Sequence, residues 1–265
     1  MWIDTHCHLD AREFGGEENA IAERAASLGV SAIVIPAVAP FNFGIVADLA
    51  RRHPNARYAL GIHPICVTDA VEADLEMLRS RVATAMADPR FVAIGEIGVD
   101  FFLPGFRDQP FRNKQEWFYS EQLKIARDFG LPVLLHVRRS QDIVLKYLRR
   151  ISVPNGIAHA FNGSFQQAET FIRLGFKLGF GGAMTFPRAL QIRRLATQLP
   201  LESLVLETDA PDISPAWRHP DINTPEEIPA IGAALAELRG VPAKEIAGIT
   251  SANAQAALPR LSLLH

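Results

Sequence analysis

Residues 114–136, KQEWFYSEQLKIARDFGLPVLLH, contain one complete helix–strand unit of a kind that recurs along the chain. Leu123 and Ala126 fall near helical spacing, and Gly130 stands where a helix C-cap is expected. The apolar run over 132–136 then predicts a buried strand. The stretch therefore predicts a helix that ends at Gly130 and leads directly into a strand.

Similar units fill the rest of the sequence. We expect helices over 17–29 and over 164–175, where Ser164 is a candidate N-cap and Gly175 a stop. The other expected strands cover 2–6, 31–37, 57–63, 91–96, 156–161, 176–181 and 203–209. Eight strands that alternate with helices imply a parallel sheet and favour a (β/α)8 TIM barrel, which takes about 250 residues. A doubly wound open sheet is the competing architecture.

The composition is that of one large domain. No linker or composition break divides the chain, so we expect a single domain over 1–265, with long loops at 104–110 and 208–227. Hydrophobic residues make up 48% of the chain, and the formal net charge of −2 argues against a protein that coats long polynucleotides. It remains compatible with an enzyme that holds a strand end with a few local groups.

The cellular setting is predicted from what the sequence lacks. Two cysteines give no disulfide framework, and we find neither a signal peptide nor an apolar run of membrane-spanning length. We therefore expect a cytoplasmic protein with no membrane association and no obligate protein partner.

Metal-competent side chains recur at the carboxyl ends of the expected strands. In a (β/α)8 barrel these ends meet at one face and carry the functional groups. Chance is a poor explanation for the whole set, which consists of His6, His8, His63, Glu96, His136, His159 and Asp209.

Strand alternation separates the first two histidines from Cys7. His6 and His8 should face the barrel mouth beside an inward Asp4, and Asp4 is a candidate to orient a ligand histidine from behind. Cys7 should face the helical layer as a small core residue.

The donor set favours a pair of divalent ions. Imidazoles and carboxylates together bind ions such as Zn, Mg or Mn. One open catalytic zinc typically uses three protein ligands, so four histidines and two acids fit two ions about 3.5–4 Å apart, joined by a carboxylate and a bridging hydroxide. Glu96 is the natural bridge, and Asp209 is both a ligand and a candidate general base.

Several of these residues also have structural alternatives. His63 precedes Pro64 and either caps a loop or contacts metal or substrate. Arg138 should face the same side as His136, where it binds a substrate phosphate or forms a salt bridge with an acid such as Glu96. Glu207 should lie one layer deeper and hold His159 or Arg138.

Other segments carry weaker signals. The glycine-rich segment 178–186 is a candidate for backbone binding of an anion. Four aromatic residues either stack on bases or pack in loops, and packing is favoured: Phe101, Phe102, Phe161 and Trp217. We expect the remaining histidines to be solvated: His53, His219 and His265.

Six motifs resemble, in order, the signatures of the TatD family of metal-dependent hydrolases: IDTHCHLD, GIHP, GEIGVDF, LPVLLHVRRS, HAFNGS and LETDAP. The resemblance implies an amidohydrolase-type TIM barrel with a two-metal site and an activity linked to DNA hydrolysis. The family's metal ligands correspond to His6, His8, Glu96, His136, His159 and Asp209. No expected strand ends in the lysine that many binuclear amidohydrolases carboxylate, which favours a TatD-like site. The loop over 212–229 departs from the family pattern, with Asn223, Pro225 and Glu226 only partly matching.

The leading prediction is a deoxyribonuclease that cleaves phosphodiester bonds, with DNA ends as the possible substrate. The alternative is an amidohydrolase-type enzyme acting on a small amide, lactone or ester, because one barrel hosts many chemistries. A third reading is a metal-binding protein without turnover.

Overall fold

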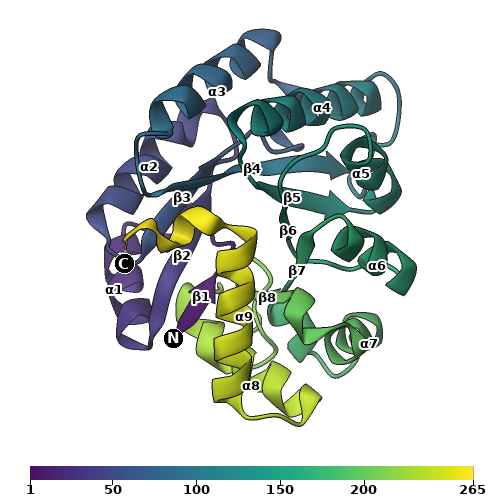
Figure 1. Cartoon of the computed structure of the whole chain (residues 1–265). Helices are drawn as coiled ribbons and strands as arrows, with labels where there is room; N and C mark the ends of the chain where they lie inside the picture. The colour runs from purple at the N-terminus through teal and green to yellow at the C-terminus, as the bar shows by residue number, and fades with distance from the viewer. Residues whose placement is uncertain (265) are drawn as a thin grey trace.

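The structure, a computed structural model, describes residues 1–264. Eight strands form one sheet in sequence order, and every neighbouring pair is parallel. Helices surround this sheet, as expected for a (β/α)8 barrel (Figure 1). The strands are β1 Trp2–Asp4, β2 Val30–Pro36, β3 Ala56–Leu60, β4 Phe91–Asp100, β5 Val133–Arg138, β6 Gly156–Ala158, β7 Phe176–Phe180 and β8 Leu204–Leu206.

The α-helices follow the strands in turn around the outside of the sheet, except for the last, which follows another α-helix. They are α1 Glu18–Ser27, α2 Phe43–Arg52, α3 Glu72–Ala85, α4 Phe111–Phe129, α5 Gln141–Leu148, α6 Phe165–Arg173, α7 Leu190–Gln198, α8 Ile228–Arg239 and α9 Ala243–Ala257. Short 3-10 turns lie at Arg12–Phe14, Pro40–Asn42, Cys66–Thr68, Gly182–Thr185, Leu201–Ser203, Pro225–Glu227 and Pro259–Leu264. No helix within residues 1–264 combines the length and apolar character that crossing a membrane requires. The cytoplasmic location stays a prediction.

The last and first strands meet just beyond their ends. Asp209 N–H donates to His6 O at 2.8 Å, and His8 N–H donates to Ala210 O at 2.8 Å. Cys7 and Ala210 form an isolated parallel bridge at the same point. The backbone that joins β8 to β1 therefore belongs to the segments that carry His6, His8 and Asp209.

The opposite end of the barrel is closed by the C-terminal segment. Helix α9 and the 3-10 turn after it run across the centre of the strand ring in yellow (Figure 1). Four residues of this segment pack in one apolar cluster with strand residues such as Val34, Leu134 and Val205. The four are Ala254, Ala257, Leu258 and Leu261.

The predicted helices are confirmed closely. Helix α4 ends at Phe129, and Gly130 caps it in the left-handed conformation at φ 64°. The Ser164 side chain caps α6 by accepting a hydrogen bond from Gln167 N–H at 3.1 Å. Satisfied helix ends of this kind are what the sequence signals encode.

The carboxyl ends of several strands differ from the prediction, in both directions. Strand β4 continues four residues past Glu96 to Asp100, whereas β1, β6 and β8 end at Asp4, Ala158 and Leu206, before their functional residues. Glu96 therefore sits inside a strand. The histidines of β1 and β6 lie on the turns that follow.

The prediction that three other histidines are solvated holds for one of them. His219 is exposed. His53 is buried, with 6% of its surface exposed, and its Nε2 lies 2.7 Å from Asn19 Oδ1. His53 was predicted wrongly because its neighbours in space come from α1, far away in sequence. His265 lies outside the described residues.

Candidate metal centre

Glu96 is the centre of the site, with imidazole nitrogens around both of its oxygens. Glu96 Oε2 lies 3.1 Å from His6 Nε2 and 3.4 Å from His8 Nε2. Glu96 Oε1 faces three further ring nitrogens, at 2.7 Å in His136, 2.9 Å in His159 and 3.3 Å in His63. The carboxylate thus has one group of histidines on each oxygen, which is the arrangement a bridging ligand requires.

Asp209 completes the group around Oε2. Its Oδ1 lies 3.7 Å from His6 Nε2 and 3.8 Å from His8 Nε2. Three sets of residues can each present one donor atom per residue to a single ion: His6, His8 and Asp209; His6, Glu96 and His159; and His63, Glu96 and His136. All six predicted ligands therefore converge, although their roles as ligands stay a prediction.

Asp100, which sequence reasoning missed, fixes the ring of His136. Asp100 Oδ2 lies 3.0 Å from His136 Nε2, and the carboxylate is fully buried. A carboxylate accepts only, so Nε2 carries the hydrogen and Nδ1 is left to face Glu96 Oε1 at 2.7 Å. Burial opposes protonation of His136, but hydrogen bonds to Asp100 and Glu96 raise its pKa, so positive charge is favoured at Nδ1 and either a proton or a metal ion can supply it.

A hydrogen bond from Ile65 N–H determines the tautomer of the His63 ring. Ile65 N–H donates to His63 Nδ1 at 3.1 Å, so the hydrogen of the neutral ring is on Nε2. Burial lowers the pKa of His63 to about 4, which keeps the ring neutral. His63 Nε2 lies 3.0 Å from His136 Nδ1. His63 therefore belongs at the metal cluster but presents an N–H donor, which suits contact with substrate better than ligation of metal.

The electrostatics of the centre demand positive charge. Burial alone would raise the pKa of Glu96, but the surrounding imidazoles hold it well below its ordinary value. Burial opposes protonation of His8 and His159, yet Glu96 raises their pKa values to about 9 and about 10. Burial and the charge of His159 lower the pKa of His6 to about 3. Divalent ions supply the same positive charge in place of protons.

The donors fit such ions on chemical grounds as well. Nitrogen atoms of two pairs of rings approach each other at 3.4 Å (His6 with His8) and 3.0 Å (His63 with His136). A mixed imidazole and carboxylate set is typical of Zn, Mn and related ions. The residues present therefore fit a metal centre around Glu96, and a pair of ions bridged by Glu96 stays a prediction.

Asp4 supports this centre by a different route from the predicted one. Its carboxylate accepts hydrogen bonds from Thr208 Oγ1 at 2.6 Å, from Thr208 N–H at 3.0 Å and from His6 N–H at 3.2 Å. Within the described chain Asp4 bonds to no imidazole ring, because its side chain faces Thr208. It holds together the backbones that carry His6 and Asp209. Cys7 is fully buried in the outer core, as predicted.

Glu207 lies at the base of the site. Its Oε1 accepts a hydrogen bond from Ala160 N–H and lies 3.9 Å from His159 Nδ1, so it supports the turn after β6 rather than Arg138. Burial raises its pKa to about 8. A Cβ at Gly179 would lie 2.0 Å from Glu207 Oε2. At this position the glycine-rich segment makes room for Glu207, a role distinct from the predicted anion binding.

Arg138 forms no salt bridge with Glu96 or with any other acid among residues 1–264. Its guanidinium lies 3.7 Å from the ring centre of Phe102, which is 43% exposed. Phe101 and Phe161 are buried and pack, as favoured. Trp217 is exposed, and its Nε1 donates to Glu227 Oε2 at 2.8 Å.

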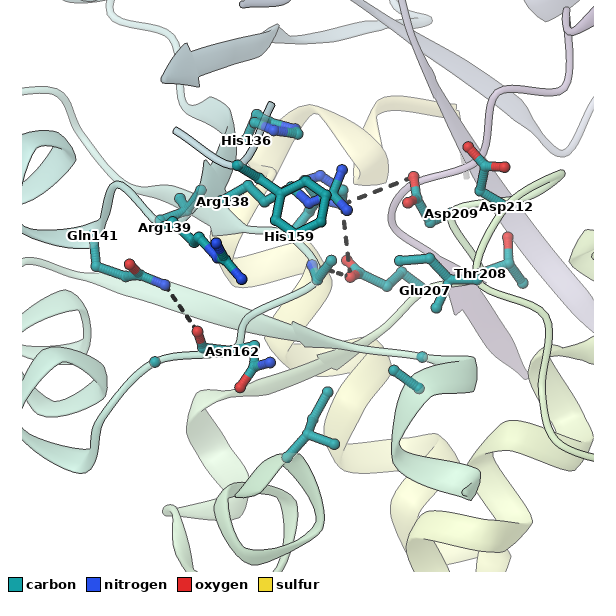
Figure 2. A pocket seen from close by; sticks show the side chains of 18 of the residues that line it. His136, Arg138, Arg139, Gln141, His159, Asn162, Glu207, Thr208, Asp209 and Asp212 are labelled. Carbon is teal, nitrogen blue, oxygen red and sulfur yellow. Dashed lines mark hydrogen bonds and ion pairs between the residues drawn. The ribbon is translucent and has the colours of Figure 1, made fainter. Parts of the chain in front are cut away.

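Two hollows open onto the centre. One, of about 880 Å³, is lined by Arg138, Arg139 and Asn162, and Figure 2 shows these residues facing Glu207 and Asp209 across it. The other, of about 620 Å³, is lined by residues such as His8, Phe41 and Ile65. His136, His159 and Asp209 border both. A substrate bound at the centre can therefore extend in two directions.

The family model described as TatD related DNase matches residues 3–259. The chain belongs to this family. The TatD assignment confirms the resemblance seen in the motifs and agrees with the barrel and with the donors around Glu96.

TatD-type relatives match along nearly the whole chain. The protein YjjV of Escherichia coli, named as an uncharacterized metal-dependent hydrolase, is 43% identical over 93% of this chain and 93% of its own length. An uncharacterized metal-dependent hydrolase of Haemophilus influenzae is 35% identical over 96% of this chain and 97% of its own. The crystal structure of YjjV, a TatD homologue, superimposes with a TM-score of 0.90 at 41% identity, covering 97% of this chain and 98% of that one.

The loop that departs from the TatD pattern is ordered by its own contacts. Buried Asn223 donates from Nδ2 to Thr208 O at 2.9 Å and to Ile213 O at 3.3 Å. Glu226 pairs with Arg24 at 2.8 Å. Asn223 therefore anchors the divergent 212–229 segment to the strand end that carries Asp209.

Proposed function

We propose that this TatD-type metal-dependent hydrolase cleaves phosphodiester bonds at nucleic-acid ends, with DNA as the leading substrate. The observation that carries the proposal is the set of nitrogen donors around both oxygens of Glu96, at 2.7–3.4 Å. The name of the matching family, TatD related DNase, supports the same bond type.

The residues of the chain divide the work by position. The ions, when bound, polarise the phosphoryl oxygen and lower the pKa of a water molecule. Asp209 borders both hollows and takes the proton of the attacking water as that water adds to phosphorus. The bond from phosphorus to the leaving oxygen breaks, and the proton on Asp209 passes to that oxygen.

His63 and Arg138 act on the substrate in this scheme. The Nε2–H of His63 donates a hydrogen bond to a phosphoryl oxygen, while its other nitrogen is held by Ile65 N–H. His63 is neutral and does not transfer its proton. Arg138, free of a carboxylate partner within the described residues, attracts the anionic substrate to the cavity.

A substrate panel tests the proposal on protein reconstituted separately with Zn, Mn and Mg. The panel contains single-stranded DNA, RNA, a nucleotide monoester, bis(p-nitrophenyl) phosphate, an amide and a lactone. We expect metal-dependent cleavage of the phosphodiesters, with DNA degraded from its ends. Hydrolysis of the lactone or amide without any phosphodiester would replace this function with the small-ester alternative. Tight metal binding with no turnover at all would indicate a metal-binding protein.

A further inference from the structure

Arg138 and Arg139 both stack on the same aromatic ring. The guanidinium carbons lie 3.7 Å and 4.7 Å from the ring centre of Phe102. Consecutive residues of a strand point to opposite faces, so this convergence needs a departure from strand geometry. Arg139 provides it, because it follows the last residue of β5 and adopts the left-handed conformation at φ 55°. The backbone is thus turned so that two adjacent cations face one ring.

The ring itself is tied to the metal centre through Asp100. Asp100 Oδ1 accepts from Phe102 N–H at 2.7 Å, while its Oδ2 lies 3.0 Å from His136 Nε2. Phe101 N–H donates to Arg138 O at 2.9 Å and joins the ends of β4 and β5. One buried carboxylate therefore fixes both a candidate metal ligand and the aromatic platform.

The two guanidinium groups are available to an anion. Neither arginine forms an ion pair with a carboxylate in residues 1–264, and both are exposed. A guanidinium that stacks on a ring uses its face and leaves its N–H edge for oxygen acceptors. Figure 2 shows Arg138 and Arg139 on the side of the cavity away from Asp209 and Asp212. The cavity thus has a cationic side and an acidic side.

The location of the pair separates it from the bond to be cleaved. Arg138 lies two residues beyond His136 on the same strand, a rise of about 6.6 Å. Stacking holds its side chain against Phe102, in the turn after β4. An anion held by both arginines is therefore a neighbour of the phosphate at the metal centre.

We propose that Arg138, Arg139 and Phe102 form a clamp for a second phosphate, one unit away from the scissile phosphodiester. The inference rests on the proposed phosphodiesterase function and narrows it: the preferred substrate carries at least two phosphates. The second phosphate is either a terminal monoester or the next phosphodiester of a chain, since both present oxygens to the paired guanidiniums. Arg139 and Phe102 determine specificity through this contact.

Short thymidine oligonucleotides test the clamp on metal-reconstituted full-length protein. TpT carries one phosphate, pTpT and TpTp add a monoester at either end, and TpTpT adds a second diester. We expect kcat/KM for at least one of the last three to exceed that for TpT by roughly tenfold or more, as charge-assisted hydrogen bonds predict. The substrate that gains identifies which source of phosphate the clamp binds, and on which side.

Two variants and a control assign the preference to these residues. Arg139→Asn removes one guanidinium and retains a residue that tolerates left-handed backbone, and Phe102→Leu removes the platform with both charges intact. In each variant the ratio of kcat/KM for the preferred two-phosphate oligonucleotide to kcat/KM for TpT should fall to about twofold or less, even if both rates change. Arg149→Asn, which removes an exposed guanidinium outside the cavity, should keep the full preference.

A binding measurement separates the clamp from the proposed function. Calorimetric titration of chelator-treated protein with TpT and with the preferred two-phosphate oligonucleotide needs no turnover. We expect tighter binding of the latter, with the difference lost in Arg139→Asn. Cleavage of TpT and the other oligonucleotides at equal efficiency, with equal binding, would overturn the clamp and leave the phosphodiesterase standing. Failure to cleave any of them would end the proposed function, and the titration would then decide the clamp alone.

Discussion

The two ends of the barrel are built on opposite principles. The end covered by α9 is a dry cluster in which Leu258 and Leu261 pack against strand residues such as Val34. The other end buries Glu96, Glu207 and several imidazoles. Within residues 1–264, the four non-glycine residues with positive φ all follow strands at this polar end: Arg139, Ala160, Asp209 and Ile213.

The two ends also differ in their expected contributions to the free energy of folding. A non-glycine residue in a left-handed conformation costs about 1–3 kcal/mol, and buried charges cost more unless they are paired. The apolar end gains free energy from burial, at about 25 cal/mol per Å². We infer that the closed end stabilises the fold and that the open end uses part of that stability to hold its donors in place. Substitutions at the two ends should therefore have separable effects.

The largest effect is expected from Glu96→Gln at the polar end. The amide keeps the shape of the side chain but removes the negative charge that both groups of imidazoles share. Activity should fall by at least about a thousandfold, as when an essential charged group is lost, while circular dichroism shows an intact fold. Asp209→Ala should have an effect of similar size. Full activity in either variant would defeat the proposed mechanism.

Leu258→Ala tests the apolar end. The side chain is fully buried at the end of α9, so truncation should lower the free energy of unfolding by about 2–5 kcal/mol. Metal affinity and turnover of the folded enzyme should not change. Leu190→Ala, at a side chain that is 75% exposed, is the matched control and should leave chemical denaturation unaltered. A loss of metal affinity in Leu258→Ala would break the separation between the ends.

The sequence predicted the fold well because its signals are local. Gly130 and Ser164 mark helix ends, and the short apolar runs mark strands, so the alternation that defines the barrel could be read directly. Strand ends were less predictable, because they depend on pairing with neighbours. Strand β4 extends to Asp100 because it pairs with β5 as far as Asp100 opposite Arg138.

Those features of the candidate site that follow from residue type and position on a strand could be predicted. Those that depend on hydrogen-bond or stacking partners from other segments could not. The six donors converge as expected. The contact of Asp100 with His136 and the stacking of Arg139 on Phe102 depend on hydrogen bonds and backbone angles that no spacing reveals. The GEIGVD motif contained a signal for Asp100. Asp100 lies four residues after Glu96, and residues an even number apart on a strand face the same side of the sheet.

Asp100→Asn tests the role of the carboxylate behind His136 at the polar end. An amide nitrogen opposite His136 Nε2 favours the tautomer with its hydrogen on Nδ1, the atom that faces Glu96. Metal affinity should fall by about 10–100-fold, the usual range for loss of a carboxylate behind a ligand histidine. Competition with a chelating dye measures it. Asp108→Asn removes an exposed charge from the loop after β4 and should leave the affinity unchanged.

The smallest expected effect is a pH dependence of the free energy of unfolding. It arises from His53, which caps the C-terminal end of α2 just before β3. Burial, followed by the charge of Arg52, lowers the pKa of His53, while Glu18 and Glu23 oppose the shift weakly. The unfolded chain therefore binds a proton at a higher pH than the folded chain does. Stability should fall as pH drops below the ordinary histidine pKa of about 6.5, until His53 also protonates in the folded state.

His53→Gln isolates this contribution from the titrating histidines of the metal centre. Glutamine retains an amide that donates to Asn19 and removes the titration. The free energy of unfolding of wild type minus that of the variant should decrease as pH is lowered from 7.5 to 5, measured by urea denaturation at fixed ionic strength. Because His53 is far from Glu96 in the fold, the same difference should appear with and without added metal, as distant sites are additive. A difference that depended on metal would mean that the two ends of the barrel are energetically coupled.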